Sequence, residues 1–297
     1  MKNRGILLLH LAALLLGGSG LFSKLIEWPA ATIIFSRSLL SFLLLAVTIF
    51  FFSRNSFKVH AVKDLLIILL SGILFGGHLL TYFSSIQAST VSIGIVALFT
   101  FPVITAFAET LFTKEKVRMK DVLTAFLVFT GVLIMVSEEG FTLENGMLAG
   151  IGLGLISAFF YAFRNLVQKY YLQKYSALSI LCYQLLVTAF ISIPFMEFEP
   201  LKISSNEIGL LFILSLVCTV IPHSLIIYSL KTVKAKTVSI ILGLMVVYAM
   251  LLAHVILDEV ITLPLVFGGL LVFSATLFES FYLNWNERKT KKVKVNT

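Results

Sequence analysis

Hydrophobic and polar residues alternate along the chain in long blocks. Apolar runs long enough for a membrane helix are separated by short stretches that hold most of the charges. About 20 helical residues at ~1.5 Å each cross the ~30 Å hydrocarbon core of a bilayer, and in lipid only a helix satisfies the backbone polar groups of such a run. The pattern predicts an all-α integral membrane protein with ten transmembrane helices, near residues 6–23, 30–52, 65–87, 91–113, 122–137, 147–168, 178–196, 208–229, 237–257 and 262–283.

Polar side chains inside these runs follow the helical period. Residues three, four, seven and eleven positions apart share one helix face, and six of the expected helices carry such a polar stripe. One isolated polar residue would be unremarkable, but six stripes need a common wet interior. The pattern predicts an aqueous substrate cavity lined by Arg37, Ser41, His78, Tyr82, Glu109, Tyr161, Arg164, Tyr183, Gln184, His223 and Tyr248.

Arg37 is the sharpest of these signals, because it is the only charge in the run from Ala30 to Phe52. An arginine near the centre of a membrane helix costs roughly 2.5–3.5 kcal/mol on insertion scales. In one interpretation Arg37 faces the cavity and is held by Ser41 and a carboxylate, either Glu109 or one on the substrate. In the other it snorkels to the outer interface or forms a purely structural pair.

The remaining candidates also have two interpretations. Glu109 is a cavity carboxylate that accepts protons or an interfacial anchor, and Arg164 lines the cavity or the inner interface. His78 and His223 occupy like positions near the middle of two helices. Histidine changes charge near neutral pH, which suits proton coupling, but a neutral histidine that bonds a neighbouring helix is the alternative. The tyrosines line a pocket for an amphipathic solute or fill the membrane core.

Four residues are expected to disturb the regular helices. Pro102 and Pro222 lie inside apolar runs and should bend them. Gly17 and Gly18 should loosen the outer end of the first helix. Such bends either permit gating or give the molecule a fixed shape.

Composition and charge agree with a membrane protein. Of the 297 residues, 59% are hydrophobic and 13% are charged, whereas soluble domains carry about 25% charged residues. With the N-terminus in the cytoplasm, nineteen Lys and Arg fall in inner segments, and only Lys24 and Lys202 fall outside. This asymmetry predicts that both termini are cytoplasmic. It also explains the net charge of +8 without a nucleic-acid partner.

Two stretches of the chain echo each other. HLLTYFSSIQASTVSI, residues 78–93, resembles HSLIIYSLKTVKAKTVSI, residues 223–240, and each precedes a long helix that ends in an acidic residue, Glu115 or Glu259. In the predicted topology these two ends lie at opposite membrane faces. The pattern indicates an inverted repeat of five plus five helices, as in many secondary transporters. The expected division is residues 1–145, residues 146–285 and a basic tail, 286–297.

Three segments resemble the drug/metabolite transporter superfamily and specifically its EamA-type ten-helix permeases. They are WPAATIIFSRSLLSF at 28–42, FPVITAFAETLFTKE at 101–115 and TGVLIMV at 130–136. The chain departs from the family where Lys114 and Asp258 replace the usual glycines and Val246 replaces a proline. The resemblance implies two intertwined repeats around a central cavity. It places helices 5 and 10 at the periphery, where a homodimer partner would bind.

The function expected from these observations is secondary transport. No Gly-x-x-x-x-Gly-Lys-Ser/Thr loop is present for ATP, and no cofactor or metal site is indicated. The resemblance implies a plasma-membrane permease that moves a small organic metabolite, such as an amino acid or an amphipathic compound, outward. One alternative is a passive channel. Another is an intramembrane serine protease that uses the GGSG sequence at 17–20 with His223 or His254 as base.

Overall fold

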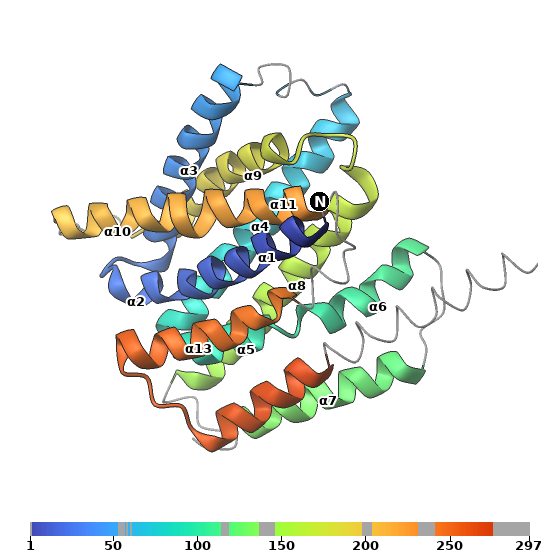
Figure 1. The fold of residues 1–297 in the computed structure, drawn as a ribbon, viewed down its shortest axis with the longest axis vertical. Helices are drawn as coiled ribbons and strands as arrows, with labels where there is room; N and C mark the ends of the chain where they lie inside the picture. Colours follow the sequence, from blue (N-terminus) through green and yellow to red (C-terminus); the bar gives the residue numbers. More distant parts are fainter. Residues whose placement is uncertain are drawn as a thin grey trace, which may run out of the picture.

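The computed structural model describes residues 2–52, 57, 59, 61–113, 119–136, 146–197, 204–230 and 241–275. These residues form helices and their connections (Figure 1). The elements, in chain order, are α1 (Lys2–Gly17), η1 (Gly18–Leu21), α2 (Phe22–Leu25), α3 (Ala30–Phe52), α4 (Val62–Ala88), α5 (Val91–Leu98), α6 (Phe101–Thr113), α7 (Met119–Val136), α8 (Met147–Tyr171), α9 (Ala177–Ser192), η4 (Ile193–Phe195), α10 (Ser205–Ser215), η5 (Leu216–Val220), α11 (Ile221–Leu230), α13 (Leu244–Leu257) and a further helix, Leu263–Ala275.

These elements confirm the all-helical membrane fold and its ten helices. Seven helical stretches in the described chain are long and apolar enough to cross a bilayer. Three shorter helices complete the set: α7, α13 and Leu263–Ala275. The basic tail, Lys114 and Glu115, and residues 231–240 of the second echo lie outside the described residues.

The expected disturbances are breaks or changes of helix type. α5 ends at Leu98 and α6 begins at Phe101, so the break precedes Pro102, which occupies the second position of the new helix, where proline is tolerated. α1 tightens into the 3₁₀ turn η1 at Gly18. Pro222 follows the π-helical turn η5, in which the hydroxyl of Thr219 donates to the carbonyl of Leu214 at 2.8 Å.

The π-helical turn explains an irregularity in the repeat. Ser71 precedes His78 by seven residues, whereas Ser215 precedes His223 by eight. A π-bulge inserts one residue into a helix, and η5 lies between Ser215 and His223. The two serines therefore stand at corresponding positions despite the difference in spacing.

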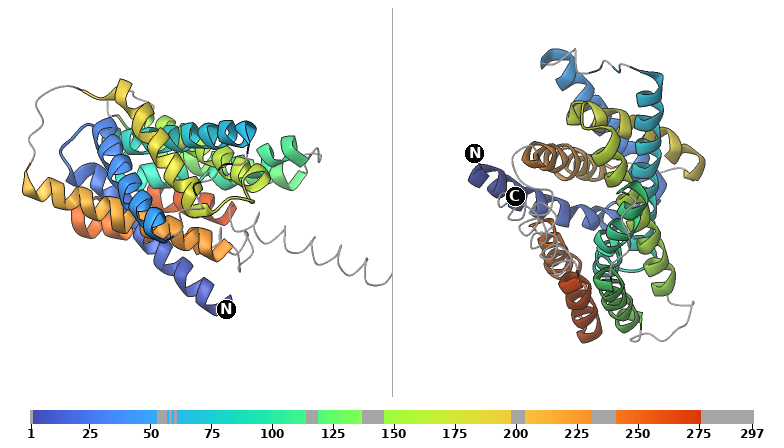
Figure 2. Two further views of the ribbon diagram at one scale, coloured as in Figure 1. Left: turned by 90° about the horizontal axis from the view of Figure 1, so that it is seen from above. Right: turned by 90° about the vertical axis from the view of Figure 1, so that its right-hand side faces the viewer.

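The helices of the two halves interlock. α4 of the first half packs along α8 of the second, and α11 of the second half packs along α1 of the first. α3 packs against α9, and α5 contacts both α8 and α13. Figures 1 and 2 show the long helices running side by side through one body. The interior is thus built from both halves of the chain.

Small residues allow the closest of these approaches. A methyl group added at Gly150 would lie 2.3 Å from the Ser89 hydroxyl, and one at Gly154 would lie 2.5 Å from the Cβ of Ala97. Glycine therefore sets the distance between α8 and the α4–α5 region, as is common in membrane helix pairs. A methyl group added at Gly131 of α7 would lie 2.8 Å from the carbonyl of Gly268. α7 and the Leu263–Ala275 helix therefore pack on each other within one chain.

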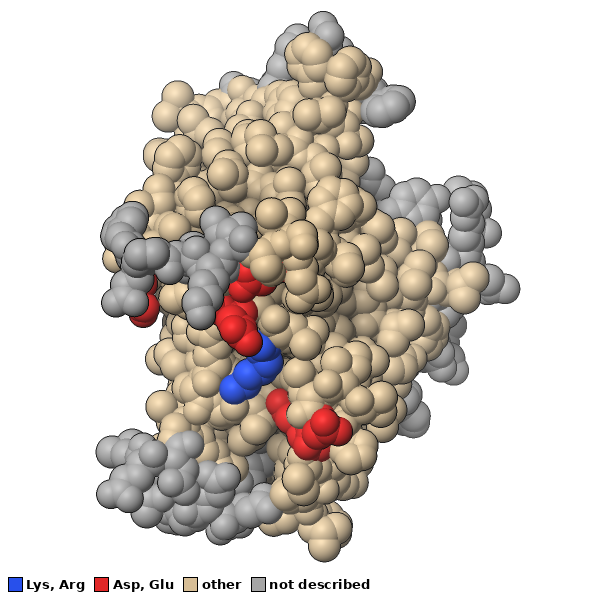
Figure 3. Space-filling view, turned by 90° about the vertical axis from the view of Figure 1, so that its left-hand side faces the viewer, with Lys and Arg blue, Asp and Glu red and all other residues tan. Residues whose placement is uncertain are grey.

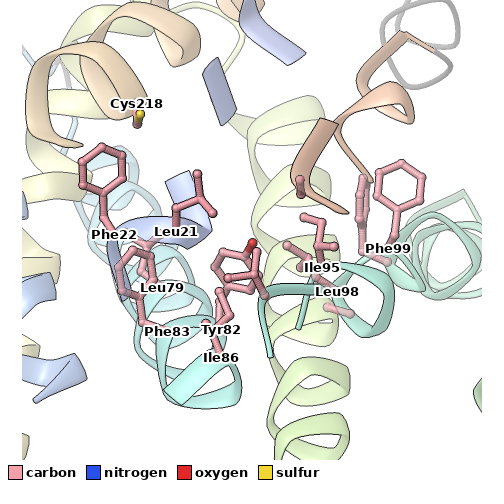
Figure 4. Packing of buried hydrophobic residues seen from close by; sticks show 14 of the residues in the cluster. Leu21, Phe22, Leu79, Tyr82, Phe83, Ile86, Ile95, Leu98, Phe99 and Cys218 are labelled. Carbon is pink, nitrogen blue, oxygen red and sulfur yellow. The ribbon is translucent and has the colours of Figure 1, made fainter. Parts of the chain in front are cut away.

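Apolar side chains fill the space between the first helices and η5. Leu21 and Phe22 meet Leu79, Tyr82, Phe83 and Ile86 of α4, with Ile95 and Leu98 of α5 on one side and Cys218 of η5 on the other (Figure 4). The two cysteines, Cys182 and Cys218, are buried and free. This apolar packing borders the polar layer described next.

Candidate functional site

Arg37 lies inside the molecule with its side chain 1% exposed. Its Nε donates to the hydroxyl of Thr219 at 2.8 Å, and its guanidinium lies 5.3 Å from the ring centre of Phe83. Two further hydrogen bonds join α3 to the end of α10 beside Arg37. The Ser41 hydroxyl donates to the carbonyl of Ser215 at 3.2 Å, and the Ser215 hydroxyl donates to the carbonyl of Arg37 at 3.3 Å. Arg37 therefore sits where α3 of one half meets η5 of the other.

Arg164 on α8 is the second buried guanidinium and is 4% exposed. Its Nη2 donates to Oε1 of Gln184 at 2.8 Å, and Gln184 in turn donates to the hydroxyl of Ser71. The guanidinium lies over the ring of Phe75 at 4.3 Å and is 5.8 Å from the ring of Tyr161. Neutral amides, hydroxyls and aromatic faces thus orient the charge.

The two histidines lie beside these arginines. His78 Nδ1 is 2.7 Å from the hydroxyl of Ser157, which donates to the carbonyl of His78 at 3.0 Å. The ring centres of His78 and Tyr161 are 4.6 Å apart, and the His223 ring is perpendicular to that of Phe75 with their centres 5.5 Å apart. Phe75 contacts both the Arg164 guanidinium and the His78 ring. Arginines and histidines therefore share one buried polar layer.

Three donors in this layer lack a hydrogen-bond partner in the described structure: Nη1 of Arg37, Nε of Arg164 and the hydroxyl of Tyr82. Neither arginine forms a salt bridge with a described carboxylate. Leaving a buried donor unpaired costs about 1–3 kcal/mol, and more for a charged group. The layer is therefore suited to receive an anionic acceptor.

Two contacts expected in the cavity interpretation of Arg37 are wrong. Glu109 pairs with Lys169 and accepts from the Tyr170 hydroxyl at 2.6 Å near the end of α8, so it is not the partner of Arg37. Its side chain is 25% exposed, which fits the interfacial-anchor alternative. Ser41 bonds a backbone carbonyl and does not hold the Arg37 guanidinium.

Two of the candidate tyrosines lie outside the polar layer. The Tyr183 hydroxyl donates to the carbonyl of Phe57 at 2.8 Å, in the connection between α3 and α4. Tyr248 of α13 packs closely against Gly17 and joins a small apolar cluster on α1. Tyr82 and Tyr161, in contrast, both contact the ring of His78.

The predicted cavity residues omit several members of the layer, among them Thr219, Ser157, Phe75 and Ser71. Phe75 lies between Arg164 and His223, but an aromatic residue in an apolar run carries no distinguishing signal. Ser71 anchors Gln184, and its place in the register was hidden by the extra residue of η5. Aligning the two echoes and the residues before them with a one-residue gap would have placed Ser71 opposite Ser215.

A further contact between the halves involves Glu259, which follows α13. Its carboxylate accepts from the backbone N–H of Val91 at 2.7 Å and from the backbone and hydroxyl of Ser92 at 3.2 and 2.9 Å. A carboxylate at a helix N-terminus is favourable because the first N–H groups of a helix have no internal partner. Glu259 thereby ties α13 to α5 at the predicted outer face. Figure 3 shows that face, where acidic side chains gather near a basic one on a surface with few charges.

No group of three or more metal-ligating side chains occurs among the described residues. The fold and the buried layer define a class: a polytopic helical membrane protein with a polar interior between two interlocked halves. Residues 3–137 and 148–281 each match the EamA-like transporter family, so the chain belongs to that family. The two matches also support the repeat. The family consists of transporters, so the protein is not an enzyme and the serine-protease alternative is excluded.

Curated relatives cover most of the chain at low identity. The S-adenosylmethionine uptake transporter of Rickettsia bellii (strain RML369-C) is 25% identical over 266 residues, which are 88% of this chain and 86% of the relative. The corresponding transporter of Rickettsia prowazekii (strain Madrid E) is 24% identical over 265 residues, 88% of this chain and 84% of the relative. The uncharacterized transporter YxxF of Bacillus subtilis (strain 168) is 25% identical over 251 residues, 82% and 78% of the two chains.

A solved crystal structure, described only as that of a protein, shares the fold. It superposes with a TM-score of 0.69 at 13% identity, over 97% of this chain and 100% of the other. At this identity the likeness concerns the arrangement of the helices alone.

Proposed function

We propose that this family member is a secondary transporter that moves a small organic metabolite carrying a carboxylate, by alternating access and without ATP. The observation that carries the proposal is the buried layer, in which Arg37 Nη1 and Arg164 Nε have no hydrogen-bond partner among the described residues. The layer lies where helices of both halves meet. Secondary transporters with inverted repeats bind substrate at such a junction.

The chemistry of Arg37 fits this role. The N–H donors of a guanidinium are fixed in one plane, so the protein can hold one while another binds a carboxylate, which the point charge of lysine does not reproduce. With Nε held by Thr219, the orientation of the Arg37 guanidinium is fixed before substrate arrives. The carboxylate takes the unpaired Nη1. Rocking of one half against the other then exposes the bound pair to either side.

The names of the curated relatives suggest which substrates to test first. Their names specify S-adenosylmethionine, which carries a carboxylate, and specify uptake. These names favour inward movement over the outward direction expected from the resemblance. S-adenosylmethionine, S-adenosylhomocysteine and methionine are therefore the first compounds to test, together with unrelated carboxylates.

The test is counterflow in proteoliposomes loaded with each probe. We expect saturable counterflow for at least one carboxylate in the wild-type protein. Arg37→Lys and Arg37→Gln should fold and lose roughly tenfold or more of the rate, because the Nη1 donor for the carboxylate is lost. Lys63→Gln, which removes an exposed cation elsewhere, is the control. Equal rates in wild type and Arg37→Gln would contradict the proposal, and flux without counterflow would indicate a channel.

The orientation of the chain is part of the proposal. We infer a plasma-membrane protein with both termini in the cytoplasm, supported by the distribution of Lys and Arg in the sequence. A reporter that is active only outside the cytoplasm should be active when fused after Glu139 and silent after Arg118. Both residues lie outside the described part of the chain. The reverse pattern would overturn the orientation.

A further inference from the structure

Glu259 joins the second half of the chain to the first through its carboxylate. The two oxygens accept three hydrogen bonds, from the backbone N–H of Val91 at 2.7 Å and from the N–H and hydroxyl of Ser92 at 3.2 and 2.9 Å. The next N–H of α5, on Ile93, donates to the hydroxyl of Thr90 at 3.1 Å. The first three N–H groups of α5 are therefore satisfied, two of them by a residue that follows α13.

The turn after α13 holds Glu259 in position. Asp258 has a φ of 54°, a left-handed conformation that is costly for any residue except glycine. The backbone N–H of Glu259 donates to the carbonyl of Ala253 at 3.3 Å, and Nδ1 of His254 lies 2.8 Å from the carbonyl of Glu259. Such a strained conformation persists only where the surrounding contacts fix it. The turn is therefore arranged to present the carboxylate to α5.

Closely packed residues lie between Glu259 and the polar layer. Glu259 is half-buried, whereas Val91 beneath it is 0% exposed. A methyl group added at Gly20 of η1 would lie 2.9 Å from the Tyr82 hydroxyl and 3.2 Å from Cγ1 of Val91, so η1, α4 and α5 meet there without space for another methyl group. Tyr82 in turn stacks on the ring of His78, with the ring centres 6.0 Å apart. Figure 4 shows Tyr82 among the apolar side chains of this region.

Glu207 shows how a carboxylate at a helix N-terminus acts when it serves only its own helix. It accepts from the backbone N–H of Ser204 at 2.8 Å and forms a capping box at the start of α10, also at the predicted outer face. Glu259 instead satisfies a helix of the other half. Leaving the buried N–H groups of α5 unpaired is costly unless water reaches them. Separation of the halves at Glu259 is therefore coupled to the entry of water at this face.

We propose, on the basis of the transport function above, that Glu259 is the outer latch of the transport cycle, which keeps the outer side of the polar layer closed by holding α13 on α5. Opening to the outside breaks its three hydrogen bonds and hydrates the N–H groups of Val91 and Ser92. Opening to the inside leaves these bonds intact. Weakening the latch therefore shifts the protein toward the state that is open to the outside and leaves the contacts of the polar layer unchanged.

The test measures the access of a water-soluble reagent to the polar layer from each side of the membrane. Tyr161→Cys, in a background with Cys182→Ala and Cys218→Ala, supplies a thiol beside the ring of His78. Sulfonatoethyl methanethiosulfonate is applied to membrane vesicles of both orientations, and the rate of reaction is measured from each side.

Glu259→Gln should raise the rate from the outside roughly tenfold or more, the factor expected for the loss of one charge-assisted hydrogen bond. The reason is that one carboxylate oxygen becomes an amide NH₂, which cannot accept from the N–H groups of α5. The rate from the inside should not rise. Glu207→Gln is the matched control, because it changes the same residue type at the same face within one half, and it should change neither rate.

Ser92→Ala is the milder variant, because it removes only the hydroxyl donor of the latch. It should raise the outside rate roughly threefold, and it decides the question if Glu259→Gln does not fold. Rates that rise equally from both sides, or an equal rise in Glu207→Gln, would show general loosening and overturn the latch. Rates unchanged in both latch variants would also overturn it and leave the transport function intact. A thiol that reacts from neither side would contradict the transport function and the latch with it.

Discussion

Arg37 and Gln184 occupy the same position in the two halves of the chain. Each is seven residues beyond the first residue of its helix, Ala30 for α3 and Ala177 for α9. Each donates to a hydroxyl on a helix of the other half, Arg37 to Thr219 and Gln184 to Ser71. The two positions therefore correspond, while the charge and the partner do not, because Thr219 lies four residues beyond Ser215, the counterpart of Ser71. The repeat supplies two equivalent places for a polar side chain, and the protein makes one of them cationic.

Arg37 and Gln184 also differ in their remaining polar atoms. Arg37 keeps an unpaired Nη1, whereas Gln184 uses its carbonyl to orient Arg164. In the proposed site, the first half contributes Arg37, and the second contributes Arg164 together with Gln184, which orients it. Helix symmetry thus positions the interior, and substitutions between the repeats give it its chemistry.

Exchanging the two residues should have the largest effect. In Arg37→Gln with Gln184→Arg, the new guanidinium would face Arg164 without a carboxylate, and we expect a loss of roughly 3–5 kcal/mol of stability. Arg37→Gln alone should keep its fold, because it removes a buried charge. Thermal unfolding and gel filtration in detergent measure both variants. A double variant as stable as wild type would show that the two positions are interchangeable.

Removing the Thr219 hydroxyl should lower the free energy of unfolding more than removing the Ser71 hydroxyl. Thr219→Val leaves Nε of the charged Arg37 unpaired, at roughly 1.5–3 kcal/mol, whereas Ser71→Ala leaves the neutral amide of Gln184 short of one partner, at roughly 1–1.5 kcal/mol. The unfolding midpoints of the two variants, compared with that of the wild type, measure this difference in stability. If Ser71→Ala is the more destabilising, the charge asymmetry between the halves does not govern the layer.

Glu109→Gln should have the smallest effect. Glu109 lies at the surface end of α6, where it pairs with Lys169, and exposed ion pairs contribute about 0–1 kcal/mol. We expect the transport rate and its dependence on a proton gradient to match the wild type. Abolished proton-driven accumulation in a folded Glu109→Gln protein would restore this residue as the coupling carboxylate.

Much of this account follows from periodicity. Ten apolar runs, one charge between Ala30 and Phe52, and polar stripes at helical spacing suffice to predict the fold and a polar interior. The partners within that interior do not follow. Glu109 shares a stripe with cavity candidates, yet the length of α6 carries it to the helix end, where Lys169 and Tyr170 are available. Thr219 came within reach of Arg37 through the π-helical turn, which has no distinct sequence signal.

Sequence similarity between the repeats also predicted part of the structure, but it did not predict the contacts between the two halves. It identified Glu259 as the end of an echo, but not its hydrogen bonds to Val91 and Ser92 of the opposite half. Such contacts depend on which helices cross, as the close approach of α8 to α4 and α5 at Gly150 and Gly154 illustrates. Single-sequence reasoning has no access to that geometry.

The central claim is that the buried layer is a solvent-reachable cationic site during the transport cycle. Tyr161→Cys, in a background with Cys182→Ala and Cys218→Ala, puts a thiol beside His78 and keeps both arginines. Its rates of reaction with an anionic sulfonatoethyl and a cationic trimethylammonioethyl methanethiosulfonate are measured in membranes and divided by the rates with free thiol. The account predicts that the anionic reagent reacts faster, that Arg164→Gln narrows the difference, and that a transported anion slows both reactions. Equal rates for the two reagents, or a thiol that reacts with neither from either side of the membrane, would contradict it.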